Sequence, residues 1–320
     1  MEASTKPASW KLLLAFAIIY FVWGSTFLAI RIGVREVPPF LLAAIRFVIA
    51  GAVLYGWTAA KRAPSPTVRE WRAAALVAVL IFVVDYGLVF WAEQRVPSGI
   101  TAVMMAGIPV FMALSEIVIL KTQRLTLRLV VALLIGIGGV AVLVSRTFSF
   151  GDAPIDPVGA AALLIAGLGW SIGSALTRKL HLPADKTVSS AAQMFAGGIL
   201  LALVAAGAGE FRGFRVQAVS LKAWLALAYL IVAGSIVAYT AYVWLIHHES
   251  PTKVGTYAYV NPVVAVVVGY FLGGESIGPR TIVGTLLVLV SVVVITTASR
   301  KKTESIPAAP VEENQLTTGD

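Results

Sequence analysis

The chain has 320 residues, of which 58% are hydrophobic and 13% are charged, and its net charge is +9. A soluble domain usually carries about 25% charged residues, so this composition, with a mean hydropathy of +0.88, indicates an integral membrane protein. The positive charge does not indicate nucleic-acid binding, because the basic residues flank apolar segments instead of forming one patch. The lack of cysteine excludes disulfides and thiolate metal sites.

Ten apolar segments of about membrane-spanning length follow one another along the chain, joined by short connections. They are too long and too uniformly apolar to be strands of an outer-membrane barrel. We therefore expect an all-α integral membrane protein with ten transmembrane helices and antiparallel neighbours. The predicted spans are approximately residues 12–30, 39–60, 73–92, 98–120, 127–145, 157–177, 187–207, 222–246, 252–272 and 280–298.

The basic residues predict how these spans are oriented. If residues 1–11 are cytoplasmic, 16 basic residues fall in the inside segments and 8 in the outside segments. This bias predicts cytoplasmic termini and an even number of spans. The first apolar run is too long for a secretory signal, so we expect it to be retained. The polar tail, residues 299–320, is predicted to be disordered and cytoplasmic.

An internal repeat relates the two halves of the sequence. The stretch Trp23–Arg31 has a counterpart in Trp170–Arg178, and Trp91 and Pro109 are spaced by 18 residues, as are Trp244 and Pro262. Five spans per half would make the repeats inverted in the membrane, as in alternating-access transporters. The alternative is chance recurrence of two residue types that are common in apolar helices. The predicted repeats are residues 12–146 and 147–298.

Four segments resemble the EamA-like permeases of the drug/metabolite transporter superfamily, which are ten-helix exporters of the bacterial inner membrane. The resemblance implies a central cavity lined mainly by spans one to four and six to nine, but no particular substrate. The segments are Trp23–Gly51, Val96–Phe111, Ser250–Glu275 and the following span that includes Gly284.

Asp85 lies near the middle of the third predicted span, where an ionised carboxylate facing lipid costs about 2.5–3.5 kcal/mol. We expect it to face the interior, as a proton-coupling group, a docking point for a cationic substrate group, or part of a structural pair. Arg46 lies seven residues into the second span, about 10 Å deep, so it needs a partner or a polar cavity. Asp85 or Glu93 could reach it, as a gate or a static pair; snorkelling is the further alternative.

Other side chains are candidates for lining the cavity, although packing is the alternative for each of them. Asn261 precedes Pro262, and together they predict a local break in the ninth span, with Pro109 as the matching break in the fourth. Glu116 is expected to snorkel or to pair locally. Glu275 is expected to have a structural role. The candidate lining residues are Trp23, Tyr86, Trp170, Gln193, Tyr239, Tyr242, Tyr257, Tyr259 and Asn261.

The sequence contains no HExxH, P-loop or GxSxG motif, so it predicts neither an enzyme nor a nucleotide-driven pump, and no cofactor or metal. The leading hypothesis from the sequence is that the protein is a secondary active exporter of a small metabolite or drug-like solute, with protons as a candidate coupling ion. Import or exchange of a small solute and a non-transport scaffold or lipid-handling role are the alternatives. The lipid bilayer is the expected surrounding, and the chain is expected to act as a monomer or a homodimer.

Overall fold

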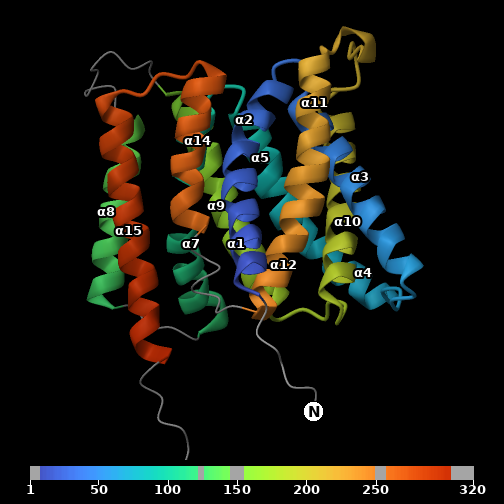
Figure 1. The fold of residues 1–320 in the computed structure, drawn as a ribbon, viewed down its shortest axis with the longest axis horizontal. Helices are drawn as coiled ribbons and strands as arrows, with labels where there is room; N and C mark the ends of the chain where they lie inside the picture. Colours follow the sequence, from blue (N-terminus) through green and yellow to red (C-terminus); the bar gives the residue numbers. More distant parts are fainter. Residues whose placement is uncertain (1–7, 122–125, 145–154, 249–256, 304–320) are drawn as a thin grey trace, which may run out of the picture.

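The computed structural model describes residues 8–121, 126–144, 155–248 and 257–303. All regular structure in these ranges is helical, and the helices run side by side in one bundle (Figure 1). Within the described ranges, seven helices are long and apolar enough to cross a membrane. Three shorter apolar stretches, Val130–Val142, Val260–Gly273 and Pro279–Ser291, occupy the predicted fifth, ninth and tenth spans. The all-helical membrane class is therefore confirmed.

We call each run of consecutive helical elements that forms one candidate span a rod. In the first half of the chain, three rods combine α-helical and π-helical segments, the latter labelled η. The first rod starts at Ser9, three residues before the predicted span, and the third starts at Val68. The elements are α1 (Ser9–Ala17), η1 (Ile18–Val22), α2 (Trp23–Gly33), α3 (Pro39–Ala60), α4 (Val68–Ala78), η2 (Val79–Tyr86), α5 (Gly87–Ala92), α6 (Ser98–Met105), α7 (Ile108–Ser115), η3 (Glu116–Leu120) and α8 (Leu127–Val144).

The described part of the second half contains longer continuous α-helices and one π-helical segment. The final helix extends to Thr303, beyond the predicted end of the tenth span. The elements are α9 (Pro157–Thr177), α10 (Lys186–Gly207), the short 3₁₀ turn η4 (Val216–Ala218), α11 (Leu221–Tyr229), η5 (Leu230–Val237), α12 (Ala238–His248), α14 (Tyr257–Gly273) and α15 (Pro279–Thr303).

The two predicted proline breaks have different outcomes. The fourth rod is interrupted between α6 and α7, directly before Pro109, which confirms that break. The break expected at Pro262 is wrong, because α14 continues through the proline. Pro262 lies in the second turn of α14, where a missing N–H removes one hydrogen bond without ending the helix. Irregular backbone occurs instead in the π-helical segments, which often mark functional sites.

Carboxylates from neighbouring connections cap three helices that begin at the end of the bundle opposite the N-terminus. Each carboxylate accepts hydrogen bonds from backbone N–H groups that have no partner within their own helix. These contacts join segments that are far apart in the sequence. Glu210 caps α3 through Leu41 at 2.8 Å, Glu275 caps α6 through Ser98 at 2.8 Å, and Glu36 caps α11 through Ser220 at 2.6 Å.

Contacts between the two halves occur in matching pairs. The helix α3 packs along α10, and α8 packs along α15 at one edge of the bundle (Figure 1). The rod of α2 contacts α11 and α14, and α9 correspondingly contacts η2 and α7. The match extends to single residues. A Cβ on Gly51 would come within 2.5 Å of the backbone nitrogen of Phe195, and one on Gly198 equally close to that of Val48.

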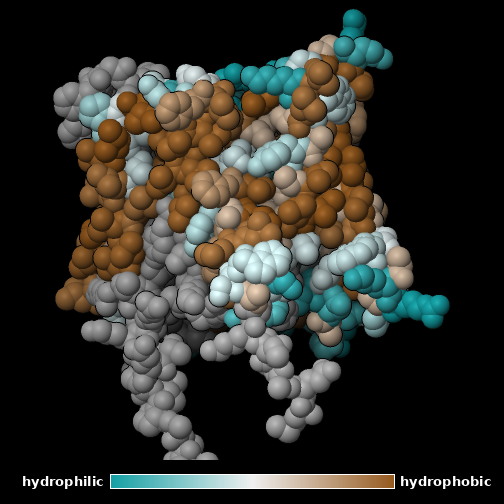
Figure 2. All heavy atoms as spheres, in the orientation of Figure 1, coloured by the Kyte–Doolittle hydropathy of each residue, from teal (hydrophilic) through white to brown (hydrophobic). Residues whose placement is uncertain are grey.

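On the face shown in Figure 2, a broad band of apolar side chains lies between more polar residues above and below it. Leu203, Phe271 and Leu286 are among the large apolar side chains exposed on the outer faces. Charged side chains that lie at mid-height, such as Arg46 and Asp85, are instead buried inside the bundle. The outer faces are thus apolar, unlike those of a soluble protein, and these two buried charged groups lie where the halves meet.

Candidate functional site

Arg46 belongs to α3 and lies in the bundle interior against η5, with 2% of its surface exposed. Its Nε donates a hydrogen bond to the Ser235 hydroxyl at 2.9 Å. The guanidinium lies 4.7 Å from the centre of the Phe47 ring and 5.3 Å from that of Tyr86, so cation–π attraction contributes to its placement. Its Nη1 is buried and has no hydrogen-bond partner. The arginine therefore retains a free donor in the bundle interior.

Asp85 and Tyr86 are neighbours at the end of the π-helical segment η2. Asp85 is 2% exposed, as expected from its sequence position, and its Oδ1 has no hydrogen-bond partner. Tyr86 packs edge-on against Trp170 of α9, with ring centres 6.1 Å apart. This contact places the guanidinium of Arg46 and the indole of Trp170 on the same tyrosine ring. Spans two, three and six thus meet at Tyr86.

Trp23 organises a second group of aromatic side chains. Its indole nitrogen donates to the Gly234 carbonyl at 3.1 Å. Its ring lies 5.3 Å from that of Tyr242 and 5.2 Å from that of Tyr257. Gly234 also lies against the Arg46 guanidinium, since a Cβ added there would be 3.3 Å from Nη2. The turn of η5 that contains Gly234 therefore contacts both the second group and Arg46.

The remaining predicted lining residues make polar contacts within and between helices. Tyr239 and Ser190 share a hydrogen bond between their hydroxyls, which joins α12 to α10. Gln193 donates to the Ser189 hydroxyl at 3.0 Å. With its amide oriented to satisfy both contacts, Asn261 donates to the carbonyls of Tyr257 and Tyr20, at 3.2 and 3.1 Å. The side chains of Tyr259 and Glu116 lie outside the described residues.

Gly234 connects the two aromatic groups, because its carbonyl accepts the Trp23 hydrogen bond and the glycine lies against the Arg46 guanidinium. Tyr239 belongs to the second group, since its ring lies 6.3 Å from that of Tyr242. The structure therefore brings Arg46, Tyr86 and Trp170 together with the group around Trp23. We call this set of residues the central site: Trp23, Arg46, Asp85, Tyr86, Trp170, Tyr239, Tyr242 and Tyr257.

The expected ion pair between Arg46 and a carboxylate is not formed in this structure. In the described residues neither Asp85 nor Glu93 lies within ion-pairing distance of Arg46, whose polar partner is the Ser235 hydroxyl. Glu93 follows α5 near one end of the bundle, so it is separate from the central site. It is fully buried, and both of its carboxylate oxygens lack hydrogen-bond partners.

Glu93 instead belongs to a group that includes Arg31 and Glu275. Arg31 donates to the Glu93 and Val96 carbonyls, each at 2.6 Å, and its Nε lies 3.4 Å from Glu275 Oε1. Glu275 is structural, as expected, since it caps α6. Sequence reasoning missed the contribution of Arg31. Its position at the end of the repeated Trp23–Arg31 stretch was the available signal.

The chain is similar to known proteins along most of its length. The model of the EamA-like transporter family matches residues 10–145 and 157–297. The chain is 37% identical over 285 residues to the uncharacterized inner membrane transporter YedA of Escherichia coli K12, covering 88% of this chain and 89% of that protein. It is 26% identical over 276 residues to Protein PecM of Dickeya dadantii, covering 86% and 88% of the two chains.

The fold is also similar to that of a protein known from a crystal structure. The TM-score is 0.58 at 23% sequence identity, and the match covers 92% of this chain and 99% of the other. At this level of identity the similarity concerns the fold alone.

Proposed function

Because this chain belongs to the EamA-like transporter family, we propose that it is a secondary active exporter of a small metabolite or drug-like solute. It is a multi-pass transporter of the bacterial inner membrane, as the matched relatives and the apolar helices indicate. In the proposed mechanism, two inverted five-helix halves expose the central site to one side of the membrane at a time.

The observation that carries the proposal is the presence of two buried charged residues in the central site that do not pair with each other. Arg46 and Asp85 are both buried, and each has a polar atom without a hydrogen-bond partner. A structural pair would satisfy these groups against each other, because unpaired charges inside a membrane protein are costly. Polar groups without a protein partner can bind and release a ligand reversibly. The surrounding rings supply apolar faces for the remainder of a small solute.

The matched contacts between the halves support the inverted repeat. The family model matches the chain twice, once in each half. Gly51 and Gly198 occupy the same place when Trp23 is aligned with Trp170, and each makes the same close approach to the opposite helix. Such reciprocal contacts are expected when two similar units are related by a twofold axis.

Asp85 is the candidate for coupling export to protons. A carboxylate that gains and loses a proton inside the membrane changes the charge of the site, and with it the relative energies of the two access states. The excess of basic residues in the predicted inside segments supports cytoplasmic termini. In that orientation the Glu275 and Glu36 caps face the outside.

The proposal is tested by comparing extracellular small molecules from bacteria that express the intact chain, the Asp85→Asn variant, the Arg46→Gln variant or an empty vector. Membrane levels of the protein are matched. The control is Glu70→Gln, which alters the carboxylate of the capping box at the start of the same rod. We expect a solute to accumulate outside with the intact chain and the control, and not with the two central-site variants.

The other outcomes are equally informative. Accumulation with all variants would retain export and remove Asp85 and Arg46 from its path. Depletion of a medium component would assign import. Equal profiles with the chain and the empty vector would contradict transport of any solute present in the assay.

A further inference from the structure

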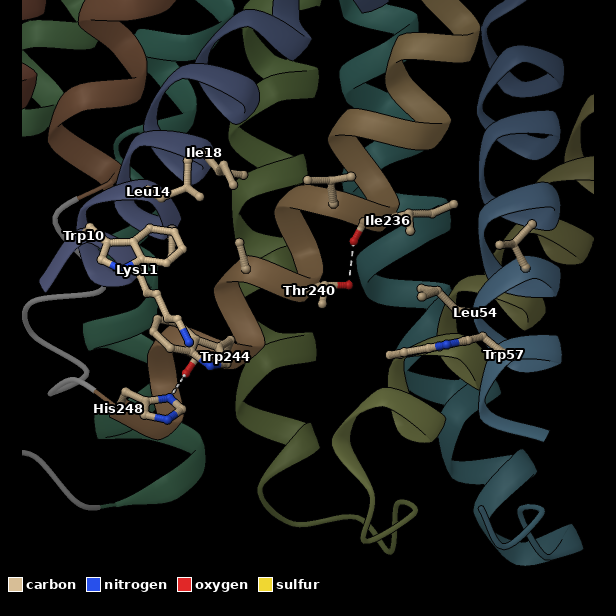
Figure 3. Close-up of a pocket in the computed structure, with 14 residues that line it drawn as sticks. Trp10, Lys11, Leu14, Ile18, Leu54, Trp57, Ile236, Thr240, Trp244 and His248 are labelled. Atoms are coloured by element: carbon tan, nitrogen blue, oxygen red, sulfur yellow. Dashed lines mark hydrogen bonds between the residues drawn. The ribbon is translucent and has the colours of Figure 1, made fainter. Parts of the chain in front are cut away.

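An open groove of about 930 Å³ lies between α1, α3 and α12, and none of its lining residues belongs to the central site (Figure 3). It lies toward the end of the bundle that holds the N-terminus (Figure 1). Leu14 and Ile18 form one wall, Trp57 forms the other, and Ile236 and Thr240 lie behind them. Thr240 adds little polarity, because its hydroxyl donates to the Ile236 carbonyl at 2.7 Å. The groove is therefore apolar along its depth.

The groove opens to the outer surface of the bundle. Trp57 and Val237, which line it, are 45% and 43% exposed. Its floor extends from Ile236 to His248, which corresponds to a helical rise of about 18 Å. Half of a bilayer hydrocarbon core is about 15 Å thick. The groove thus has the length and the orientation of one acyl chain in one leaflet.

The end of the groove near the N-terminus carries basic and aromatic side chains. The Lys11 ammonium lies 5.7 Å from the centre of the Trp10 ring, and that of Lys61 lies 4.2 Å from the centre of the Trp57 ring. Tryptophan and lysine are the residues that anchor helices at the headgroup level. Of the fourteen described residues that line the groove, none is Asp or Glu. The charge at this rim is therefore complementary to an anionic headgroup.

We propose that this groove binds one anionic phospholipid of the leaflet at the N-terminal end of the bundle. One acyl chain lies between Ile18 and Thr240, and Lys11 and Lys61 hold the headgroup at the rim. An uncharged apolar solute would use the walls but would gain nothing from the two lysines. The site is independent of the proposed transport function, because it involves no residue of the central site.

The proposal is tested by native mass spectrometry of the full chain in detergent, supplied with equal amounts of phosphatidylglycerol and phosphatidylcholine that have identical acyl chains. We expect one phosphatidylglycerol to be retained severalfold more than phosphatidylcholine. The Thr240→Trp variant fills the groove, so it should lose retention of both lipids. The combined Lys11→Gln and Lys61→Gln variant should lose the preference for phosphatidylglycerol while it still binds lipid.

Two matched variants control for general effects. Leu286→Trp places the same bulk on an exposed position of α15, and Lys222→Gln removes an exposed lysine at the opposite end of the bundle. Both should retain phosphatidylglycerol as the unaltered chain does. Should Thr240→Trp fail to fold, Val237→Trp blocks the same groove.

Equal retention of the two lipids by the unaltered chain would overturn the proposal. Retention of phosphatidylglycerol by a folded groove-filling variant would also overturn it. A loss of preference in Lys222→Gln as large as that in the rim variant would show that net charge, and not this groove, selects the lipid.

Discussion

The carboxylate of Glu275 accepts hydrogen bonds from both the backbone nitrogen and the hydroxyl of Ser98, at 2.8 and 2.7 Å, across 177 residues of sequence. The same carboxylate accepts from the Gly99 nitrogen at 3.0 Å and lies 3.4 Å from the Arg31 guanidinium. Gly269 makes room for it, since a Cβ there would lie 2.6 Å from Oε2. One side chain therefore joins three spans at one end of the bundle.

Replacing Glu275 with alanine should lower the free energy of unfolding by about 2 kcal/mol, because hydrogen bonds to charged groups contribute roughly 1.5–3 kcal/mol. Denaturation of the purified chain in mixed detergent micelles measures the loss. A double-mutant cycle with Ser98→Ala should give a coupling of at least about 0.5 kcal/mol. Additive effects of the two substitutions would contradict the direct contact.

Close packing of α3 on α10 depends on Gly51. A methyl group there would lie 2.5 Å from the backbone nitrogen of Phe195, which cannot move without displacing α10. Gly51→Ala should therefore cost about 1–3 kcal/mol by overpacking. Gly56→Ala is the control in the same helix, because a methyl group there meets nothing within 4 Å. Thermal unfolding in detergent should separate the two variants, and equal melting temperatures would contradict the packing argument.

The sequence was sufficient to predict the helical class and the burial of Arg46 and Asp85, because uninterrupted apolar segments leave little choice for either. The partner of Arg46 was not predictable. The expectation of a carboxylate followed from charge, whereas the hydroxyl of Ser235 reaches the arginine through the register of a π-helical segment. Segments that are apolar all around carry no periodicity that reveals such a change of register. The continuous helix through Pro262 was not predicted either, because a proline in the second turn removes one hydrogen bond without ending the helix.

We expect Arg46 to be required for export although it does not increase the stability of the fold. Its Nη1 is buried without a partner, and even a buried ion pair can often be replaced with apolar side chains of similar volume at no cost or with a gain of about 1–4 kcal/mol. Arg46→Met should therefore unfold at the same or a higher temperature than the unaltered chain, while export is lost. A control, Arg212→Met, alters an exposed arginine beyond α10 and should change neither property. A large destabilisation by Arg46→Met would instead assign the arginine a structural role.

Two carboxylates outside the spans should give opposite pH dependences. The backbone nitrogen and the hydroxyl of Ser220 donate to Glu36, and these hydrogen bonds hold the pKa of the Glu36 carboxyl below its ordinary value of 4.5. Its contribution to stability is therefore present above about pH 4.5 and is lost as the pH falls through the lowered pKa. Burial raises the pKa of Glu210, although the amides of Leu41 and Phe40 donate to it and oppose the shift. Its contribution is present at low pH and is lost as the pH rises through that pKa.

Melting temperatures of the unaltered chain, Glu36→Gln and Glu210→Gln, measured in detergent from pH 3 to pH 7, check both signs. The deficit of Glu36→Gln relative to the unaltered chain should be largest at pH 7 and should shrink below about pH 4. Glu210→Gln should shift in the opposite direction, gaining on the unaltered chain as the pH rises. Because both residues cap helices at the same end of the bundle, a general acid effect would move the two variants together. Parallel curves would therefore refute the assignment of these shifts to the two caps.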